Sequence, residues 1–190
     1  MKKSLIYVTI ILLTLLFLSK NSFASHHRGI DLTYECIGGT TYEFTLKVYL
    51  DCSRKGRKRY KINFTSPSGC GSDFEINICN TCSGCGSGDA PVGCGVEVSP
   101  ICPADNACNG GSLPGVKEWT YKATYTFDTA NQICDDWVIG TDINGGRTGD
   151  IDNVDVSGAV YVEAELDNTT IPCDNSSPTF NQVPIAYMCT

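Results

Sequence analysis

Histidine is scarce in this sequence, which contains only His26 and His27, both close to the amino terminus. Nucleophilic catalysis by a serine or cysteine commonly needs a positioned histidine base, so the composition argues against a hydrolase of that type. Paired carboxylates remain available to a glycosidase, because the chain has 21 Asp and Glu residues, although some such pairs will be close by chance. We therefore expect a protein that is not an enzyme.

Long hydrophobic runs are also rare, and the single one spans Leu5 to Leu18. It follows Lys2 and Lys3 and precedes a small-x-small sequence that ends at Ala24, a pattern typical of a secretory signal peptide over residues 1–24. The run is shorter than the roughly 20 residues that a membrane span needs. The alternative is a membrane anchor, but we expect an exported protein without a membrane span after signal cleavage.

Basic residues are outnumbered by acidic ones. Removal of the signal peptide takes away three lysines, so 14 − 3 leaves 11 Lys and Arg against 21 Asp and Glu, a net charge of −10. A chain with this balance is repelled by phosphate backbones. We therefore expect no nucleic-acid partner.

The mature chain has no convincing helical stripe, and its apolar residues instead recur with a period of two. This alternation is typical of strands that are buried on one face. Gly38 and Gly39 tolerate a positive φ and predict a hairpin between the first two strands. We expect strands over 30–36, 42–50, 60–64, 74–78, 116–127 and 159–166. About 165 residues of this pattern, 25–190, predict a single domain with an immunoglobulin-like antiparallel β-sandwich.

Cysteines are plentiful, and an even number in an exported chain predicts disulfides. Seven lie in a Gly-, Ser- and Pro-rich insertion over 65–115, where cross-links must replace an apolar core. We expect six disulfides among Cys36, Cys52, Cys70, Cys79, Cys82, Cys85, Cys94, Cys102, Cys108, Cys134, Cys173 and Cys189.

The stretch CNTCSGC, from Cys79 to Cys85, has the spacing of many zinc and iron–sulfur sites. In an oxidising compartment we expect disulfides here, with Cys79, Cys82 and Cys85 bonded to three different partners outside the triplet. The predicted hairpin places Cys36 about 30 Å from Cys52. These two cysteines should therefore not bond to each other.

Three segments of the sequence resemble the amino-terminal module of large Bacteroidetes surface proteins. They are GIDLTYEC with GTTYEFTLKVYLDC, VSPICP with ACNGGSLPGVKEWTYKATYTF, and YVEAELDNTTIPCDNSSPTFNQVPIAYMC. Such adhesin-like proteins often carry PKD repeats and a gliding-motility-associated or type IX secretion sorting domain. The resemblance implies a module for adhesion at the cell surface. Relatives continue beyond the residue corresponding to Thr190, which implies a module shortened from, or cut out of, a longer multi-repeat protein.

Three segments are candidate binding sites. We expect no cofactor, and the alternative is calcium, for which an acidic, glycine-rich loop over 140–158 offers oxygen ligands from Asp142, Asn144, Asp150, Asp152, Asn153 and Asp155. A basic segment between two strands, predicted to be a hairpin tip, offers a polyanion patch of Arg54, Lys55, Arg57, Lys58, Arg59 and Lys61. Cleavage after Ala24 would leave an amino-terminal copper(II) site comprising Ser25 and His27.

We expect a secreted or cell-surface module that serves adhesion or surface-layer architecture without catalysis. Its partner would be a surface polysaccharide or a protein, bound through loops on a rigid scaffold. Two alternatives stay open. One is a secreted glycan-active hydrolase, which needs two carboxylates about 5 to 9.5 Å apart. The other is a stand-alone secreted ligand or inhibitor.

Overall fold

The structure is a computed structural model that describes residues 27–144 and 159–179. The expected signal peptide therefore lies outside the described residues, as do most of the acidic loop and Cys189. The strands are β1 (His27–Gly38), β2 (Thr41–Asp51), β3 (Arg59–Thr65), β4 (Phe74–Asn80), β5 (Val96–Glu97), β6 (Val116–Thr126), β7 (Trp137–Ile143) and β8 (Val160–Leu166), with short 3-10 turns η1 (Val92–Cys94) and η2 (Ala107–Asn109). No helix in the described part of the chain is long and apolar enough to span a membrane.

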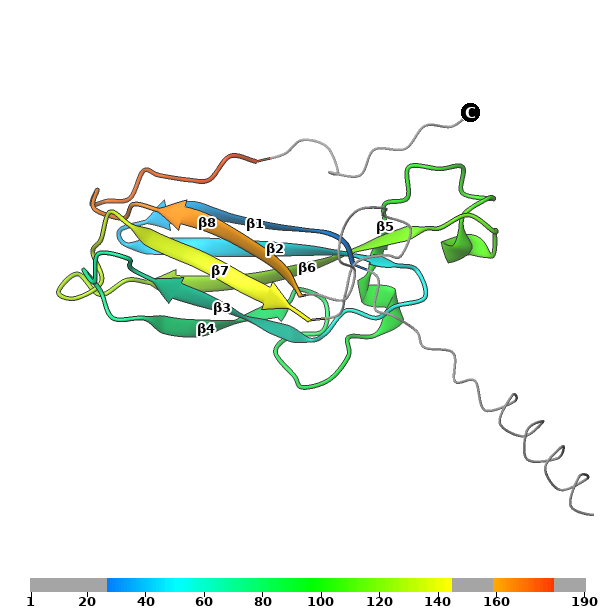
Figure 1. Ribbon diagram of the computed structural model, residues 1–190, viewed down its shortest axis with the longest axis horizontal. Helices are drawn as coiled ribbons and strands as arrows, with labels where there is room; N and C mark the ends of the chain where they lie inside the picture. The colour runs from blue at the N-terminus through cyan, green and yellow to red at the C-terminus, as the bar shows by residue number, and fades with distance from the viewer. Residues whose placement is uncertain (1–26, 145–158, 180–190) are drawn as a thin grey trace, which may run out of the picture.

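All strand pairs are antiparallel and belong to one sheet, in the order β1-β2-β6-β4-β3-β7-β8, with β5 added beside β6. The two outer strands approach each other, because the Tyr34 hydroxyl of β1 donates to the Glu165 carbonyl of β8 at 2.8 Å. The sheet is thus barrel-like (Figure 1). The all-β, antiparallel prediction is confirmed. The immunoglobulin-like sandwich is not confirmed, since the strands form one continuous sheet.

The core forms because the alternating residues of the strands point inward. On β2 the apolar residues Phe44, Leu46 and Val48 are fully buried, while the residues between them are partly exposed. On β6, Trp119 and Tyr121 are also fully buried. Rings from separate strands then meet, as where Phe64 of β3 stacks on Phe74 of β4 with centroids 4.4 Å apart. Each buried aromatic ring removes about 150–250 Å² from water.

The first hairpin is confirmed. Strand β1 pairs with β2 around Gly38 and Gly39, whose φ angles are 124° and 62°. A segment after β8 then lies along the outer edge of β1, where the Ser177 amide donates to the Tyr34 carbonyl at 3.0 Å. The disulfide between Cys36 and Cys173 fixes this contact.

Strand β7 was not among the strands we expected. Residues 140–143 were assigned to the acidic loop, but they continue a strand that begins at Trp137. Gly140 and Asp142 hide the alternation, since a glycine carries no apolar signal and Asp142 is on the exposed face. Gly140 is suited to this position because a Cβ atom there would lie 2.5 Å from the Tyr161 hydroxyl on β8. The loop therefore starts later than predicted.

Ten of the twelve cysteines form five disulfides within the described residues, with Cα–Cα distances from 4.8 to 5.8 Å. Two of them, Cys52–Cys108 and Cys70–Cys134, connect the cysteine-rich region to the rest of the chain. Cys36 and Cys52 take different partners, as predicted. The sixth disulfide stays a prediction, because Cys189 lies outside the described residues.

The prediction for the CNTCSGC stretch was partly wrong. Cys82 bonds outside the triplet, to Cys94, but Cys79 bonds to Cys85 within it. The cause is a tight turn after β4, in which the Asn80 side chain accepts hydrogen bonds from the amides of Cys82 and Ser83 at 3.1 and 3.0 Å. This turn reverses the chain and brings the two cysteines to a Cα–Cα distance of 4.8 Å.

Tryptic mapping without reduction tests this connectivity. The peptide 29–47 should stay joined to 148–190 through Cys36–Cys173, and the peptide 48–54 should stay joined to 62–117 through Cys52–Cys108. Fragmentation of the denatured, alkylated digest in the mass spectrometer would assign both bonds, even where the expected sixth disulfide joins all of these peptides into one species. A direct bond between 29–47 and 48–54 would contradict the hairpin, because Cys36 and Cys52 are the only cysteines of those peptides.

Candidate functional site

The basic segment is a crossover connection between β2 and β3. It was predicted to be a hairpin tip, which is wrong because β2 already has β1 and β6 as neighbours and β3 pairs with β4 and β7. Residues 52–58 therefore leave one part of the sheet and enter another, around one end of the barrel (Figure 1). A crossover of this kind needs an anchor of its own, since it pairs with none of the strands of the sheet and has an isolated β-bridge, between Arg57 and Asp89.

That anchor is Trp119 of β6. A Cβ atom at Gly56 would lie 2.5 Å from the Trp119 ring, and one at Gly95 would lie 2.7 Å from it, so both backbones touch the indole directly. Trp119 is fully buried as a result. The basic segment also joins the cysteine-rich region through backbone hydrogen bonds, with the Lys58 amide donating to Gly88 at 2.9 Å and the Ala90 amide donating to Gly56 at 2.7 Å.

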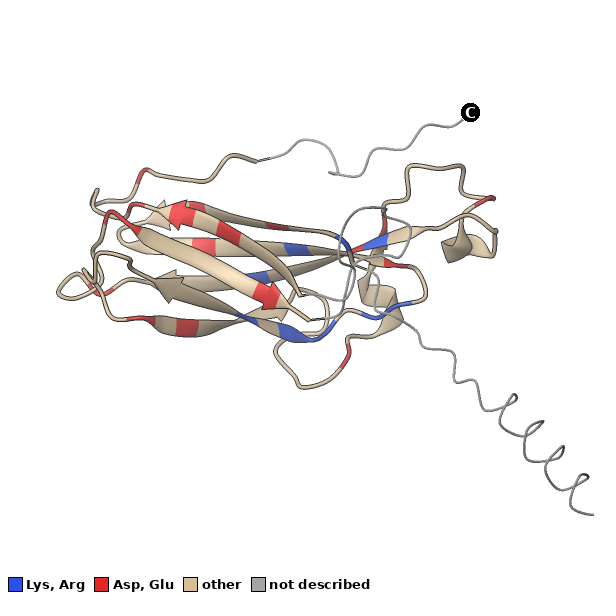
Figure 2. Cartoon of the chain, viewed as in Figure 1, with Lys and Arg blue, Asp and Glu red and all other residues tan. Residues whose placement is uncertain are grey.

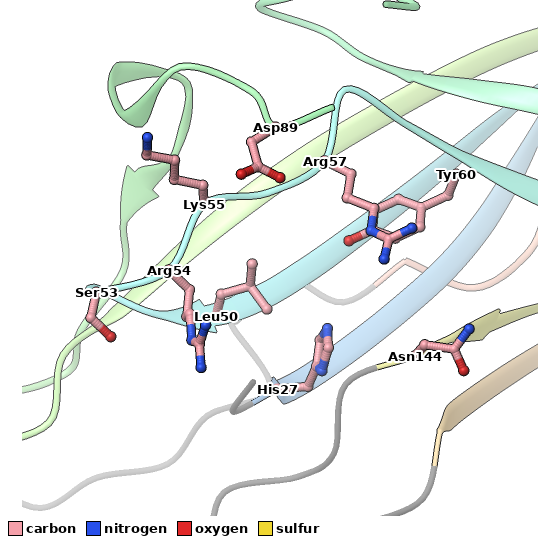
Figure 3. Close-up of a pocket in the computed structure, with 9 residues that line it drawn as sticks. All are labelled: His27, Leu50, Ser53, Arg54, Lys55, Arg57, Tyr60, Asp89 and Asn144. Carbon is pink, nitrogen blue, oxygen red and sulfur yellow. The ribbon is translucent and has the colours of Figure 1, made fainter. Parts of the chain in front are cut away.

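The segment forms one wall of an open pocket of about 580 Å³. Figure 3 shows the Arg54 and Arg57 side chains on one side of the segment. The His27 side chain, at the start of β1, points toward that side. Lys55 extends to the other side of the same ribbon. The lining residues are His27, Leu50, Ser53, Arg54, Lys55, Arg57, Tyr60, Asp89 and Asn144.

The pocket is electropositive. Three cationic side chains and one carboxylate, Asp89, line it. Among the described residues, Lys55, Arg57 and Arg59 form no salt bridge, and all three are exposed. Figure 2 shows basic residues on the connection before β3 and on the first part of β3, and acidic residues on β4, β7 and β8. A local positive potential thus persists in a chain whose overall charge is negative.

Two further hollows adjoin this pocket and share Arg57 with it. One, of about 400 Å³, is lined by Arg57, Arg59, Tyr60, Lys61, Asn63, Glu75 and Asp142. The other, of about 290 Å³, is lined by Arg57, Arg59, Ser87, Gly88 and Asp89.

Tyr60 lines both of the larger hollows, and its ring packs against Tyr121. Burial raises the pKa of the Tyr60 phenol above its usual value, and the positive charge of Arg57 offsets part of that rise. The phenol therefore stays protonated at neutral pH and can donate a hydrogen bond. Sequence reasoning missed Tyr60, because it reads as an ordinary strand residue.

Five of the six predicted polyanion residues line these hollows. The exception is Lys58, whose side chain runs along the backbone of Gly86. Sequence reasoning also missed Asp89, because no local pattern shows that the cysteine-rich region returns to the basic segment.

The predicted calcium ligands are only partly described. Asp142 lines the hollow that contains Arg57, Arg59 and Lys61, and Asn144 lines the main pocket. The remaining ligands, at 150–155, lie outside the described residues. Calcium binding stays a prediction, and the neighbouring cations disfavour it at Asp142.

The predicted copper site is also described only in part. His27 is the first residue of β1, is 6 % exposed, and lines the main pocket, whereas Ser25 lies outside the described residues. Copper binding by the amino terminus would use the backbone nitrogen and imidazole of His27. It would therefore have to compete with the start of β1, and it stays a prediction.

Comparison with protein-family models, with curated proteins and with solved structures finds no match to this chain.

The contact between Gly56 and Trp119 predicts the result of a paired substitution. Gly56→Ala should lower the free energy of unfolding by about 1–3 kcal/mol, because its methyl group must displace the indole or the connection. Gly93→Ala is the matched control, since a Cβ atom there has no neighbour within 4 Å. Urea unfolding followed by tryptophan fluorescence measures both. Equal stability of the two variants would show that the connection is not seated on Trp119.

Proposed function

We propose that this chain is a non-enzymatic, exported binding module whose basic pocket holds acidic groups of a surface polysaccharide. The observation that carries the proposal is that two exposed cations of this pocket, Lys55 and Arg57, have no salt-bridge partner among the described residues. Unpaired guanidinium groups bind carboxylates or sulfates through charge-assisted hydrogen bonds.

The scaffold supports this function. Five disulfides hold the described region and are typical of proteins made for an oxidising, extracellular space. We propose that the chain binds its ligand as immunoglobulin-like domains do, through loops that a rigid set of strands holds in place. It also includes the adhesive, cell-surface role implied by the resemblance to the Bacteroidetes surface proteins.

The hydrolase alternative depends on the hollow beside β3, which contains both Glu75 and Asp142. Glu75 forms a salt bridge with Lys61, so its carboxylate already has a partner in this hollow. A glycosidase needs two carboxyl groups that flank the scissile bond about 5 to 9.5 Å apart. In the main pocket, Figure 3 shows Asp89 on the far side of the basic segment from His27, which does not favour a relay of Ser53, His27 and Asp89. We therefore favour binding over hydrolysis.

Binding to immobilised polygalacturonate and dextran sulfate tests the proposal, with neutral dextran as the reference. The wild-type chain should bind both acidic polymers, and an Arg54→Ser/Arg57→Ser double variant should bind at least about tenfold more weakly, which corresponds to about 1.4 kcal/mol. Raising the salt from 50 to 500 mM should weaken binding, because the interacting charges are exposed.

Lys122→Ser is the charge control, since Lys122 is exposed, pairs with Glu43 and lines none of the three hollows. It should bind like the wild type. Binding no stronger than to neutral dextran would refute the proposal, as would full binding by the double variant. Release of reducing sugar during the assay would instead favour the hydrolase, and binding only to a protein would favour the secreted ligand or inhibitor.

A further inference from the structure

The three hollows have lining residues in common. All three include Arg57, the two larger ones also share Tyr60, and the smallest shares Asp89 with one neighbour and Arg59 with the other. A ligand that fills both the main pocket and the hollow beside β3 would pass Arg57 and reach the outer face of β3. We call this path the β3 groove.

The outer face of β3 carries a regular row of polar side chains. Arg59, Lys61 and Asn63 are exposed, whereas Ile62 and Phe64 between and beyond them are buried. Successive outward residues of a strand lie about 6.6–6.8 Å apart. The row thus repeats its hydrogen-bonding groups along a line, which suits an extended chain better than a single small anion.

The chemistry of the groove changes along its length. The main pocket has three cations and one carboxylate. The hollow beside β3 has three cations, two carboxylates and the amide of Asn63, and the salt bridge of Lys61 with Glu75 neutralises part of this charge. Carboxylates repel a densely charged polymer such as polyphosphate. They accept hydrogen bonds from sugar hydroxyls, so this end suits a chain with spaced charges and free hydroxyls.

We propose that the β3 groove binds several consecutive residues of a linear acidic polysaccharide, with acidic groups at Arg57 and Arg59 and sugar hydroxyls at Asn63, Glu75 and Asp142. This inference rests on the proposed function and adds to it the length and charge density of the ligand. Arg57 belongs to every part of the path, and Arg59 belongs only to the parts beyond the main pocket.

A chain-length series tests the inference by calorimetry with galacturonate, digalacturonate, tetragalacturonate and hexagalacturonate. Wild-type affinity should rise at least tenfold from the monomer to the hexamer. Arg59→Ser should weaken hexamer binding about fivefold and leave monomer binding unchanged, whereas Arg57→Ser should weaken both. Lys122→Ser should change neither, and polyphosphate of equal charge should bind more weakly than the hexamer.

The outcomes separate the two proposals. Equal affinity for all lengths, or an Arg59→Ser variant that keeps the full gain with length, would overturn the extended groove and leave the basic pocket standing. Tighter binding of polyphosphate than of the hexamer would overturn the assignment of a ligand with spaced charges. Absence of binding at every length, together with no binding to immobilised acidic polymers, would remove both proposals.

Discussion

The contact of Trp119 with two glycine backbones is the interaction on which the rest of this structure depends. Gly56 precedes the basic residues of β3, and Gly95 follows the disulfide-bonded Cys94, so one indole ring touches the connection and the cysteine-rich region together. Burial of a tryptophan side chain, at about 25 cal/mol per Å² over 150–250 Å², contributes roughly 4–6 kcal/mol. A glycine is required at both places because any side chain would separate the backbone from the ring.

This contact explains how an acidic protein maintains a positive pocket. Six of the eleven basic residues that follow residue 24 lie within residues 54–61. Repulsion between these like charges would extend the loop if nothing anchored it. The anchored backbone at Gly56 and the hydrogen bonds to Gly88 and Ala90 hold the segment in one path. The disulfides then fix the cysteine-rich region against which the segment lies, and there they take the place of an apolar core. The Arg54 and Arg57 side chains thus extend from a fixed backbone on the side of the pocket that His27 faces.

Local sequence patterns correctly predicted the features that depend on neighbouring residues alone. The alternation in β2 and β6, and the two glycines of the first hairpin, identify strands because burial of one face needs no information from elsewhere in the chain. Strand β7 was not predicted, because Gly140 and Asp142 interrupt the alternation of apolar and polar residues along it. The order β2-β6-β4-β3, the Cys79–Cys85 bond and the return of Asp89 to the basic segment depend on contacts between distant residues. For the site, the sequence therefore indicated the basic residues but not the groove that they line.

Proton NMR of the glycine residues tests the central contact most directly. The account predicts that the α protons of Gly56 and Gly95 both show ring-current shifts away from their random-coil positions and nuclear Overhauser effects to the Trp119 indole. Gly93, which has no neighbour within 4 Å of its Cβ position, should show neither. Random-coil shifts at Gly56 and Gly95, with no Overhauser effect to the indole, would mean that the basic segment is not seated on Trp119 and would contradict the account of the pocket.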